Sequence, residues 1–358
     1  MGNGWQWGGQ LYYNDFWEWD QGAGTWTQKA NFTGTACGDG VAFSIGNYGY
    51  TLTGRGASGS VTNELWEWDQ ATNTWSQKAM FPGSMRGFAA GFAIGLKGYI
   101  GCGIVGINAS DDFWEWDQLT DTWTQRANIP VAHAFCVSFS IGNLGYVCTG
   151  TDDSGNILND LWEFDPAINT WTQKSNFPGG IRDFASGFSI GNHGYVGTGW
   201  DGSSAFSDFW RFDPSLNSWA QMANYPHLIT DIDHAGFSIG CKGYFGTGAT
   251  DPNSGVAYYN DFWEYDPDTC SLTGINETGD ESSELEIFPN PFSEKLNISI
   301  NSHQPAEIII YDMNSKKVMH KTFTKAVSIN TKSLAKGIYV YEVKNKNGYF
   351  RRAKIVKN

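Results

Sequence analysis

The chain has 358 residues and a formal net charge of −14 at pH 7; 41% of its residues are hydrophobic and 17% charged, which is typical of a globular protein with a buried core. The 17 Trp, 23 Phe, 16 Tyr and 44 Gly combine large aromatic side chains with turn formers, which favours many short strands over an all-α fold. Such acidity makes nucleic acid and anionic membrane surfaces poor partners, because phosphate binding needs a basic footprint, and no apolar run is long enough to span a membrane.

A repeat of about 48 residues fills the chain up to residue 272. Each copy carries a motif like Asp15 to Asp20, whose first Trp recurs as Trp17, Trp66, Trp114, Trp162, Trp210 and Trp263. Six residues after the closing Asp a second Trp follows in five copies, and Leu272 takes its place in the sixth. Residues 182–223 show four strand-length pieces separated by turn sequences. Each copy therefore predicts a four-stranded antiparallel sheet that stacks on its neighbours as a propeller blade does.

The order of pieces within a copy resembles the kelch repeat. A Phe-x-Ile-Gly strand is followed by a Gly-Tyr strand, a strand ending in aromatic-Asp, and the second Trp. The family's Gly-Gly pair usually reads Thr-Gly here, at Gly150, Gly199 and Gly248. The resemblance implies a six-bladed β-propeller in which the first strand of each blade lines a central channel. Only five copies of that first strand are present, so we expect the first blade to lack its inner strand.

The N-terminus begins inside a repeat. Met1 to Trp5 look like the shortened end of a Ser-Ile-Gly-Asn-x-Gly-Tyr segment, and no secretory leader precedes them. We therefore expect that an upstream segment with a leader and the missing strand is absent from this chain.

Composition changes sharply near residue 280. Residues 1–280 contain all 17 Trp and carry 10 basic and 30 acidic residues, a net −20, whereas residues 281–358 carry 13 basic and 7 acidic residues, a net +6. We predict a propeller over residues 1–273, an acidic linker over 274–284 and a second domain over 285–358.

The second domain is predicted to be a small Ig-like β-sandwich of seven short strands. Four segments, 288–291, 310–314, 334–339 and 354–357, resemble the C-terminal sorting domain of the type IX secretion system of Bacteroidetes. The resemblance implies export through the outer membrane by that machinery, followed by removal of the domain and release or surface attachment. An accessory Ig-like module is the alternative.

Several kinds of chemistry lack their motifs. The six Cys show no metal-binding spacing, and we expect Cys102 and Cys148, in adjacent copies, to be buried small side chains rather than a disulfide. No phosphate-binding loop, zinc-protease motif or nucleophile elbow is present, and we expect no catalytic residue, metal or cofactor. The Asp that closes each motif recurs in every copy, as Asp20, Asp69, Asp117, Asp165, Asp213 and Asp266. Such repetition indicates a turn cap rather than a carboxylate site.

Binding residues are expected where the copies differ. Nine residues before each Phe-x-Ile-Gly glycine, at the start of the channel strand, the copies carry different residues: Cys37, Arg86, His133, Arg182 and Asp231. The kelch resemblance implies that this position and the loops between the second and third strands form the ligand face. Our candidates at the channel mouth are Arg86, His133, Arg182, Asp231, Asp233, His234, Trp200 and Tyr258. The alternative for the arginines is that they are solvated or paired with acids such as Asp183.

These features predict a secreted or surface-attached, monomeric propeller that binds a glycan, peptide or surface protein. Guanidinium groups beside aromatic rings suit a carboxylate-bearing or sugar ligand. The rival is an extracellular carbohydrate-active enzyme: mutarotase-like, with Arg182 and His234 as candidate groups, or oxidase-like, for which the His residues have no obvious matching Tyr-Cys partners. A purely structural surface scaffold is the third possibility.

Overall fold

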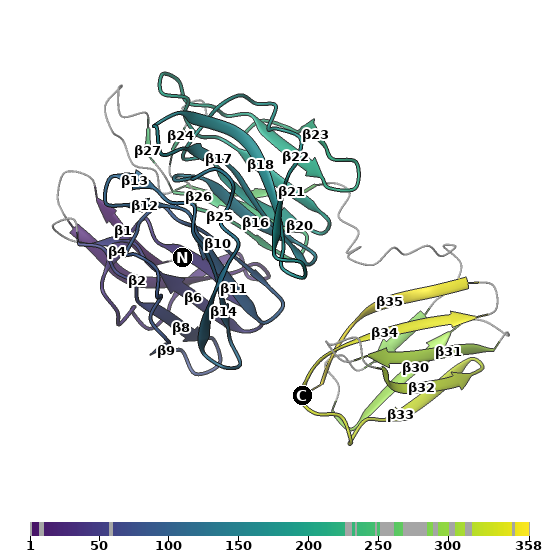
Figure 1. Ribbon diagram of the computed structural model, residues 1–358. Coiled ribbons are helices and arrows are strands. Elements are labelled where there is room, and N and C mark those ends of the chain that lie inside the picture. Colours follow the sequence, from purple (N-terminus) through teal and green to yellow (C-terminus); the bar gives the residue numbers. More distant parts are fainter. Residues whose placement is uncertain are drawn as a thin grey trace. The chain divides into compact units, whose positions relative to one another are not determined.

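The computed structural model describes residues 2–6, 11–56, 60–225, 231–232, 235–247, 249–250, 261–267, 285–288, 293–300, 305–311, 317–345 and 348–357. The all-β prediction is confirmed, since every regular element in these residues is a strand. No helix in them is long and apolar enough to cross a membrane. The chain divides into two compact units, Met1–Ser271 and Leu272–Asn358, and the whole of the predicted linker, 274–284, lies outside the described residues (Figure 1).

In the described part of the first unit, six antiparallel sheets follow one another in chain order, numbered here one to six. Sheets two to five have four strands, and sheets one and six have three. The strands of the first three sheets are β1 (Gly2–Gln6), β2 (Leu11–Asp20) and β3 (Thr25–Gln28); β5 (Val41–Ile45), β6 (Tyr48–Leu52), β8 (Leu65–Asp69) and β9 (Thr74–Gln77); and β10 (Ala90–Ile94), β11 (Lys97–Gly101), β14 (Phe113–Asp117) and β15 (Thr122–Arg126). The strands of the other three are β16 (Val137–Ile141), β17 (Leu144–Thr151), β18 (Ile157–Asp165) and β19 (Thr170–Gln173); β20 (Ser186–Ile190), β21 (His193–Gly197), β22 (Phe209–Asp213) and β23 (Ser218–Gln221); and β25 (Ala235–Ile239), β26 (Lys242–Gly246) and β28 (Phe262–Tyr265).

Three short two-stranded ladders lie in the segments that connect these strands. They are β4 (Cys37–Gly38) with β7 (Arg55–Gly56), β12 (Ile104–Val105) with β13 (Asn108–Ala109), and β24 (Asp231–Ile232) with β27 (Ala249–Thr250).

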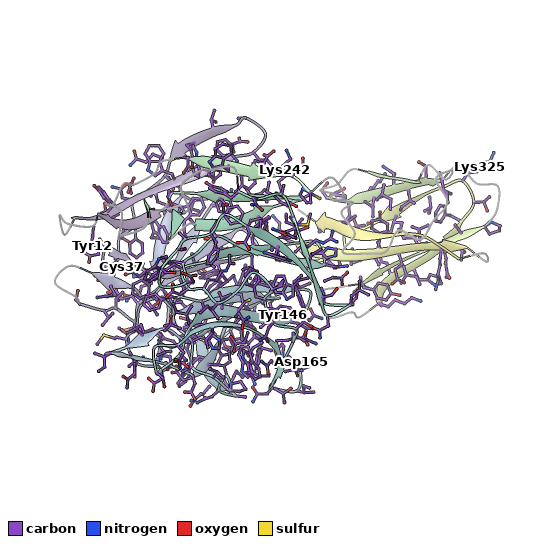
Figure 2. The ribbon with its side chains drawn as sticks, turned by 90° about the horizontal axis from the view of Figure 1, so that it is seen from above. Tyr12, Cys37, Tyr146, Asp165, Lys242 and Lys325 are labelled. Carbon is purple, nitrogen blue, oxygen red and sulfur yellow. The ribbon has the colours of Figure 1, made fainter. Side chains whose placement is uncertain are left out.

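Turn chemistry explains why each repeat folds into a meander. The first two strands of a sheet are joined by a two-residue hairpin, as where Ile94 pairs with Lys97, and its first residue, Gly95, has a positive φ of 61°. The last two strands are joined by a turn that the motif's closing Asp caps. At Asp165, labelled in Figure 2, the carboxylate accepts the Ala167 N–H at 2.8 Å. The turn-cap prediction is confirmed at five of the six positions, and the turn after Asp266 lies outside the described residues.

Neighbouring sheets pack through a glycine and an aromatic ring. The Gly of the Gly-Tyr motif lies against the inner-strand Phe of the preceding sheet, so that a Cβ on Gly145 would stand 2.0 Å from the ring of Phe92. The same pairing recurs between Gly194 and Phe139. A side chain at this position would force the sheets apart, which explains why the repeat keeps a glycine in a strand, where glycine is otherwise unfavourable.

Aromatic contacts hold the first sheet on both sides. The ring of Phe16 lies 4.8 Å from that of Trp68 in sheet two. On the other side, Trp19 and Trp26 contact Phe262 of sheet six, at 5.0 and 4.9 Å. The first and last sheets of the unit are therefore neighbours in space.

The second unit contains two sheets, and the seven predicted strands are all present. One sheet has the order β29 (Leu285–Phe288), β30 (Lys295–Ile300), β33 (Ala326–Asn330), and the other the order β32 (Lys317–Phe323), β31 (Ala306–Tyr311), β34 (Gly337–Asn345), β35 (Gly348–Lys357). Alternate residues of both sheets, such as Ile298 and Ile308, share one buried core, as in a sandwich.

Candidate functional site

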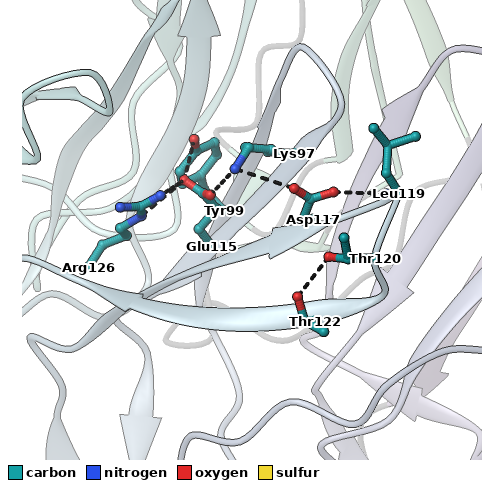
Figure 3. A network of polar contacts seen from close by, with 8 residues as sticks. All are labelled: Lys97, Tyr99, Glu115, Asp117, Leu119, Thr120, Thr122 and Arg126. Carbon is teal, nitrogen blue, oxygen red and sulfur yellow. Dashed lines mark hydrogen bonds and ion pairs between the residues drawn. The ribbon is translucent and has the colours of Figure 1, made fainter.

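Many polar side chains of the first unit belong to a network that repeats from sheet to sheet. In sheet three the Tyr99 hydroxyl donates to Glu115 Oε2 at 2.8 Å, Arg126 Nη2 lies 2.7 Å from the same oxygen, and Lys97 contacts the other oxygen (Figure 3). Burial raises the pKa of Glu115, but the hydrogen bonds from Arg126, Lys97 and Tyr99 outweigh it and hold the pKa below its usual value. Sheet four repeats this arrangement with Tyr146, Glu163 and Lys174. The network is therefore part of the repeated fold and does not mark one sheet as a binding site.

The two candidate arginines are fully buried and paired. Arg182 donates hydrogen bonds to both carboxylate oxygens of Asp208, from Nη1 to Oδ1 at 2.6 Å and from Nη2 to Oδ2 at 3.2 Å. Its guanidinium also lies 4.6 Å above the ring of Phe177. Arg86 holds Asp112 in the same two-pronged way, with Nη2 2.7 Å from Oδ2. This geometry matches the paired alternative, with Asp112 and Asp208 as the partners in place of Asp183, and ligand contact by the two arginines stays a prediction.

His133 lies at the equivalent position in sheet four and likewise pairs with an aspartate. It is fully buried, its Nε2 lies 3.0 Å from Asp160 Oδ1, and its Nδ1 lies 2.7 Å from the Val131 carbonyl oxygen. Burial lowers the pKa of His133, but the hydrogen bond and charge of Asp160 dominate and raise it above its usual value. Asp112, Asp160 and Asp208 also accept the indole N–H of the Trp two residues later, so each pair closes a small buried polar cluster.

The remaining candidates are placed only in part. Asp231 lies in β24, where it pairs with Thr250. Asp233, His234 and Tyr258 lie outside the described residues. In the described part of the chain no group of three or more His, Cys, Asp and Glu side chains could hold a metal ion.

Three phenylalanine rings that the sequence analysis did not select meet at the start of the inner strands. Phe135 lies 4.3 Å from Phe88 and 4.5 Å from Phe184 between ring centroids, and the three rings come from three successive sheets. All three are partly exposed. Residues at equivalent places in neighbouring sheets can touch in this way only where the sheets converge. We call Phe88, Phe135 and Phe184 the aromatic cluster.

The backbone of the aromatic cluster is left-handed. Phe88, Phe135 and Phe184 have positive φ values of 56°, 56° and 52°, a conformation that is rare for bulky residues but that the repeat imposes at this position, since the equivalent Asp39 has a φ of 58°. Inter-sheet hydrogen bonds hold it: Phe135 N donates to Phe88 O at 3.2 Å, and Phe184 N donates to Phe135 O at 3.0 Å. The aromatic cluster could have been predicted from the sequence. Phe stands two residues after Arg86, His133 and Arg182, whereas Asp39 and Asp233 take that place in other copies.

An exposed arginine lies beside this cluster. Arg55, in the short strand β7, has its guanidinium carbon 5.5 Å from the centre of the Phe88 ring. Unlike Arg86 and Arg182, this side chain is exposed and can reach a ligand.

Two buried polar atoms near Phe184 lack a hydrogen-bond partner. Asp183 is 6% exposed; its Oδ2 accepts the Thr151 hydroxyl at 3.0 Å, and its Oδ1 has no partner. Burial raises the pKa of Asp183 to about 6. Trp200, one of the predicted residues, exchanges two backbone hydrogen bonds with Asp183, and its indole Nε1 also has no partner. Unsatisfied buried groups are uncommon and concentrate at functional sites.

The second unit has a family match. The model of the secretion system C-terminal sorting domain matches residues 286–358. Residues 286–358 form a sorting domain. The sorting domain indicates a secreted or cell-surface protein that is handled by the type IX machinery.

The first unit is similar to a solved structure of YjhT, a kelch-type β-propeller protein. The two chains are 14% identical with a TM-score of 0.61, and the match covers 71% of this chain and 89% of YjhT. A likeness at this identity shows a propeller-like fold and nothing of the ligand. None of the curated proteins matches the chain.

Proposed function

We propose that the first unit is a six-bladed kelch-type propeller, with an inner strand absent from its first blade, that serves the exported protein as a binding module for a glycan, peptide or surface protein. Two observations support the blade number: six sheets follow one another in the described residues, and the first and sixth touch through Trp19 and Phe262. The likeness to YjhT supports the arrangement.

The aromatic cluster is the observation that carries the binding role. Three partly exposed rings from three sheets meet at one place, and each is kept in a strained backbone conformation by its neighbours. A left-handed residue other than glycine costs on the order of 1 to 3 kcal/mol and persists where the surrounding structure enforces it, often at ligand sites. Aromatic faces of this kind stack on sugar rings and on apolar peptide side chains.

The charged group that meets the ligand is then Arg55 and not Arg86 or Arg182. Arg55 is exposed and stacked on Phe88, whereas the other two guanidinium groups are buried on their aspartates. A carboxylate on a ligand stacked over the aromatic cluster could pair with Arg55 at modest desolvation cost.

The test is a glycan-array and peptide-library screen of the intact protein. A ligand that binds the parent should bind Phe135→Ala and Arg55→Ala at least about tenfold more weakly, since each loses a contact of roughly 1.5 kcal/mol. Ile168→Ala, at an exposed turn between β18 and β19, is the matched control. Equal affinity in all four proteins would place the ligand elsewhere.

Asp183 favours a second candidate, an enzyme that moves protons on a sugar. A buried carboxyl with a pKa of about 6 and one unpartnered oxygen is suited to acid–base chemistry near neutral pH. The measurement is the NMR rate of anomer exchange of free sugars in the presence of the parent, Asp183→Asn and Ile168→Ala. Catalysis by the parent and Ile168→Ala that is lost in Asp183→Asn supports the enzyme, and buffer rates in all three reject it.

A further inference from the structure

Two cysteines, Cys102 and Cys136, lie at the junction of sheets three and four, where the other junctions carry different residues at both positions. Cys102 follows β11 with a positive φ of 60°, and the equivalent residues in other sheets are Thr53, Thr149 and Thr198. Cys136 precedes β16, where the other sheets carry Gly40, Ala89 and Ala185. Within the described residues, this is the one place where both partners are cysteine.

The two thiols meet between the sheets. Cys136 packs against the buried cluster that contains Cys102, each thiol shifts the pKa of the other, and the neighbouring Gly103 N–H donates to the His133 carbonyl oxygen across the same junction at 2.7 Å. Cys102 is fully buried and Cys136 packs against the same apolar cluster, which includes Ala90 and Val147.

The two thiols differ in reactivity. The hydrogen bond from the Cys102 thiol lowers the pKa of Cys136, and the charge of His133 acts in the same direction. Cys136 is therefore the first of the two to form a thiolate, which is the nucleophile in disulfide exchange.

The location of the protein outside the cytosol favours oxidation of this pair of thiols. The sorting domain indicates export, and disulfides form and persist outside the cytosol. Cys241 is already disulfide-bonded, and its partner lies outside the described residues. By contrast Cys37, Cys102, Cys136 and Cys148 are free in this structure.

We propose that Cys102 and Cys136 form a disulfide in the exported protein that ties sheets three and four together beside the aromatic cluster. The oxidant is a disulfide-bearing exchange protein, or a small disulfide, on the export route. The Cys136 thiolate attacks the oxidant disulfide, forms a mixed disulfide and releases one oxidant thiolate. Cys102 then gives up its proton, attacks the Cys136 sulfur and releases the second, so that two protein thiols become one disulfide and the oxidant becomes a dithiol. Cys136, the less buried of the two, meets the oxidant, and Cys102, which is fully buried, has only to reach the Cys136 sulfur beside it.

The experiment counts free thiols and maps their bonds in the full chain, refolded with oxidised and reduced glutathione and quenched in acid. Of the six cysteines, the bridge of Cys241 takes two; the proposal leaves two free thiols, Cys37 and Cys148, whereas four remain free without it. Mass spectrometry without reductant should find the peptides of Cys102 and Cys136 linked.

Two variants separate this pair from its neighbour Cys148. Cys102→Ser should raise the thiol count from two to three, because Cys136 loses its partner, and Cys148→Ser should lower it from two to one. Four free thiols in the parent, or a bond between Cys136 and Cys148, would overturn the proposal. The disulfide-linked peptides of the parent protein show whether Cys102 and Cys136 are bonded even if a variant fails to fold.

Discussion

Arg86, His133 and Arg182 lie at one equivalent position, and each neutralises a carboxylate that the fold buries. The Asp before the third strand is held by its own sheet's cation and by an indole N–H, as Asp208 is held by Arg182 and Trp210. Removing one member of such a pair leaves the other charge buried without a partner, which costs far more than the pair contributes to stability. At these three positions arginine and histidine are therefore alternative partners for one acid, whereas the Cys37 thiol donates to the Thr53 carbonyl oxygen instead.

Arg182→Ala should lower the free energy of unfolding by about 3 kcal/mol, because Asp208 would remain largely buried without its partner. This expectation replaces the one that follows from a solvated, ligand-contacting Arg182, for which stability would hardly change. The measurement is equilibrium unfolding in urea, with the exposed Arg55→Ala as the matched control, which should lie within about 0.5 kcal/mol of the parent.

Asp183 should make stability depend on pH. Its pKa is raised to about 6 by burial, so the folded state binds this proton more tightly than the unfolded chain does, and its contribution to stability is present below about pH 4 and is lost as pH rises through 6. Over that window the parent should lose on the order of 2 kcal/mol relative to Asp183→Asn. Unfolding curves of both proteins at pH 4, 5, 6 and 7 check this, and a constant difference between them would mean that Asp183 titrates normally.

At the scale of the element, the outermost strand of each sheet anchors that sheet to the one before it. Trp171 of β19 donates its indole N–H to the Ala127 carbonyl oxygen after β15, at 2.9 Å, and its ring lies 4.9 Å from Phe113 of sheet three. Trp75, Trp123 and Trp219 make the equivalent hydrogen bond in their sheets. The second Trp of the repeat therefore stabilises the contact between neighbouring sheets.

Trp171→Ala should cost about 3 kcal/mol, since it removes the inter-sheet ring contact and the hydrogen bond together. Trp171→Phe keeps an aromatic ring against Phe113 and should cost only about 1 kcal/mol, the value of the lost hydrogen bond. Thermal and urea unfolding of the two variants measure the difference. Equal losses would show that the hydrogen bond, and not the packing, holds the strand.

At the scale of the molecule, the two units differ in net charge and in the origin of their sequences. The first is acidic and built from repeats, and the second is basic and carries the sorting domain. The sorting domain has its own buried core, which includes Ile298 and Ile308.

Deletion of residues 285–358 should trap the protein in the periplasm of a host with type IX machinery. The protein must be expressed behind a signal peptide for this experiment, so that both forms reach the periplasm. Immunoblots of periplasmic and external fractions measure the outcome, and a single substitution such as Ile168→Ala serves as the exported control. Equal amounts of the deleted and full-length forms outside the cell would contradict the role of the domain.

Local sequence determined much of this protein. Strands, hairpins and turn caps depend on residues a few positions apart, so Gly95 and Asp165 could be interpreted from their neighbours alone. The sorting domain could be recognised for the same reason, since its motifs lie in one continuous segment of chain.

Only the tertiary structure decided what the variable residues do. Arg182 finds Asp208 26 positions away, and Phe88, Phe135 and Phe184 meet from three different sheets, so spacing along the chain could not tell a buried ion pair from an exposed ligand contact. Burial and partnership depend on how the sheets converge, a property of the whole unit that no single repeat contains.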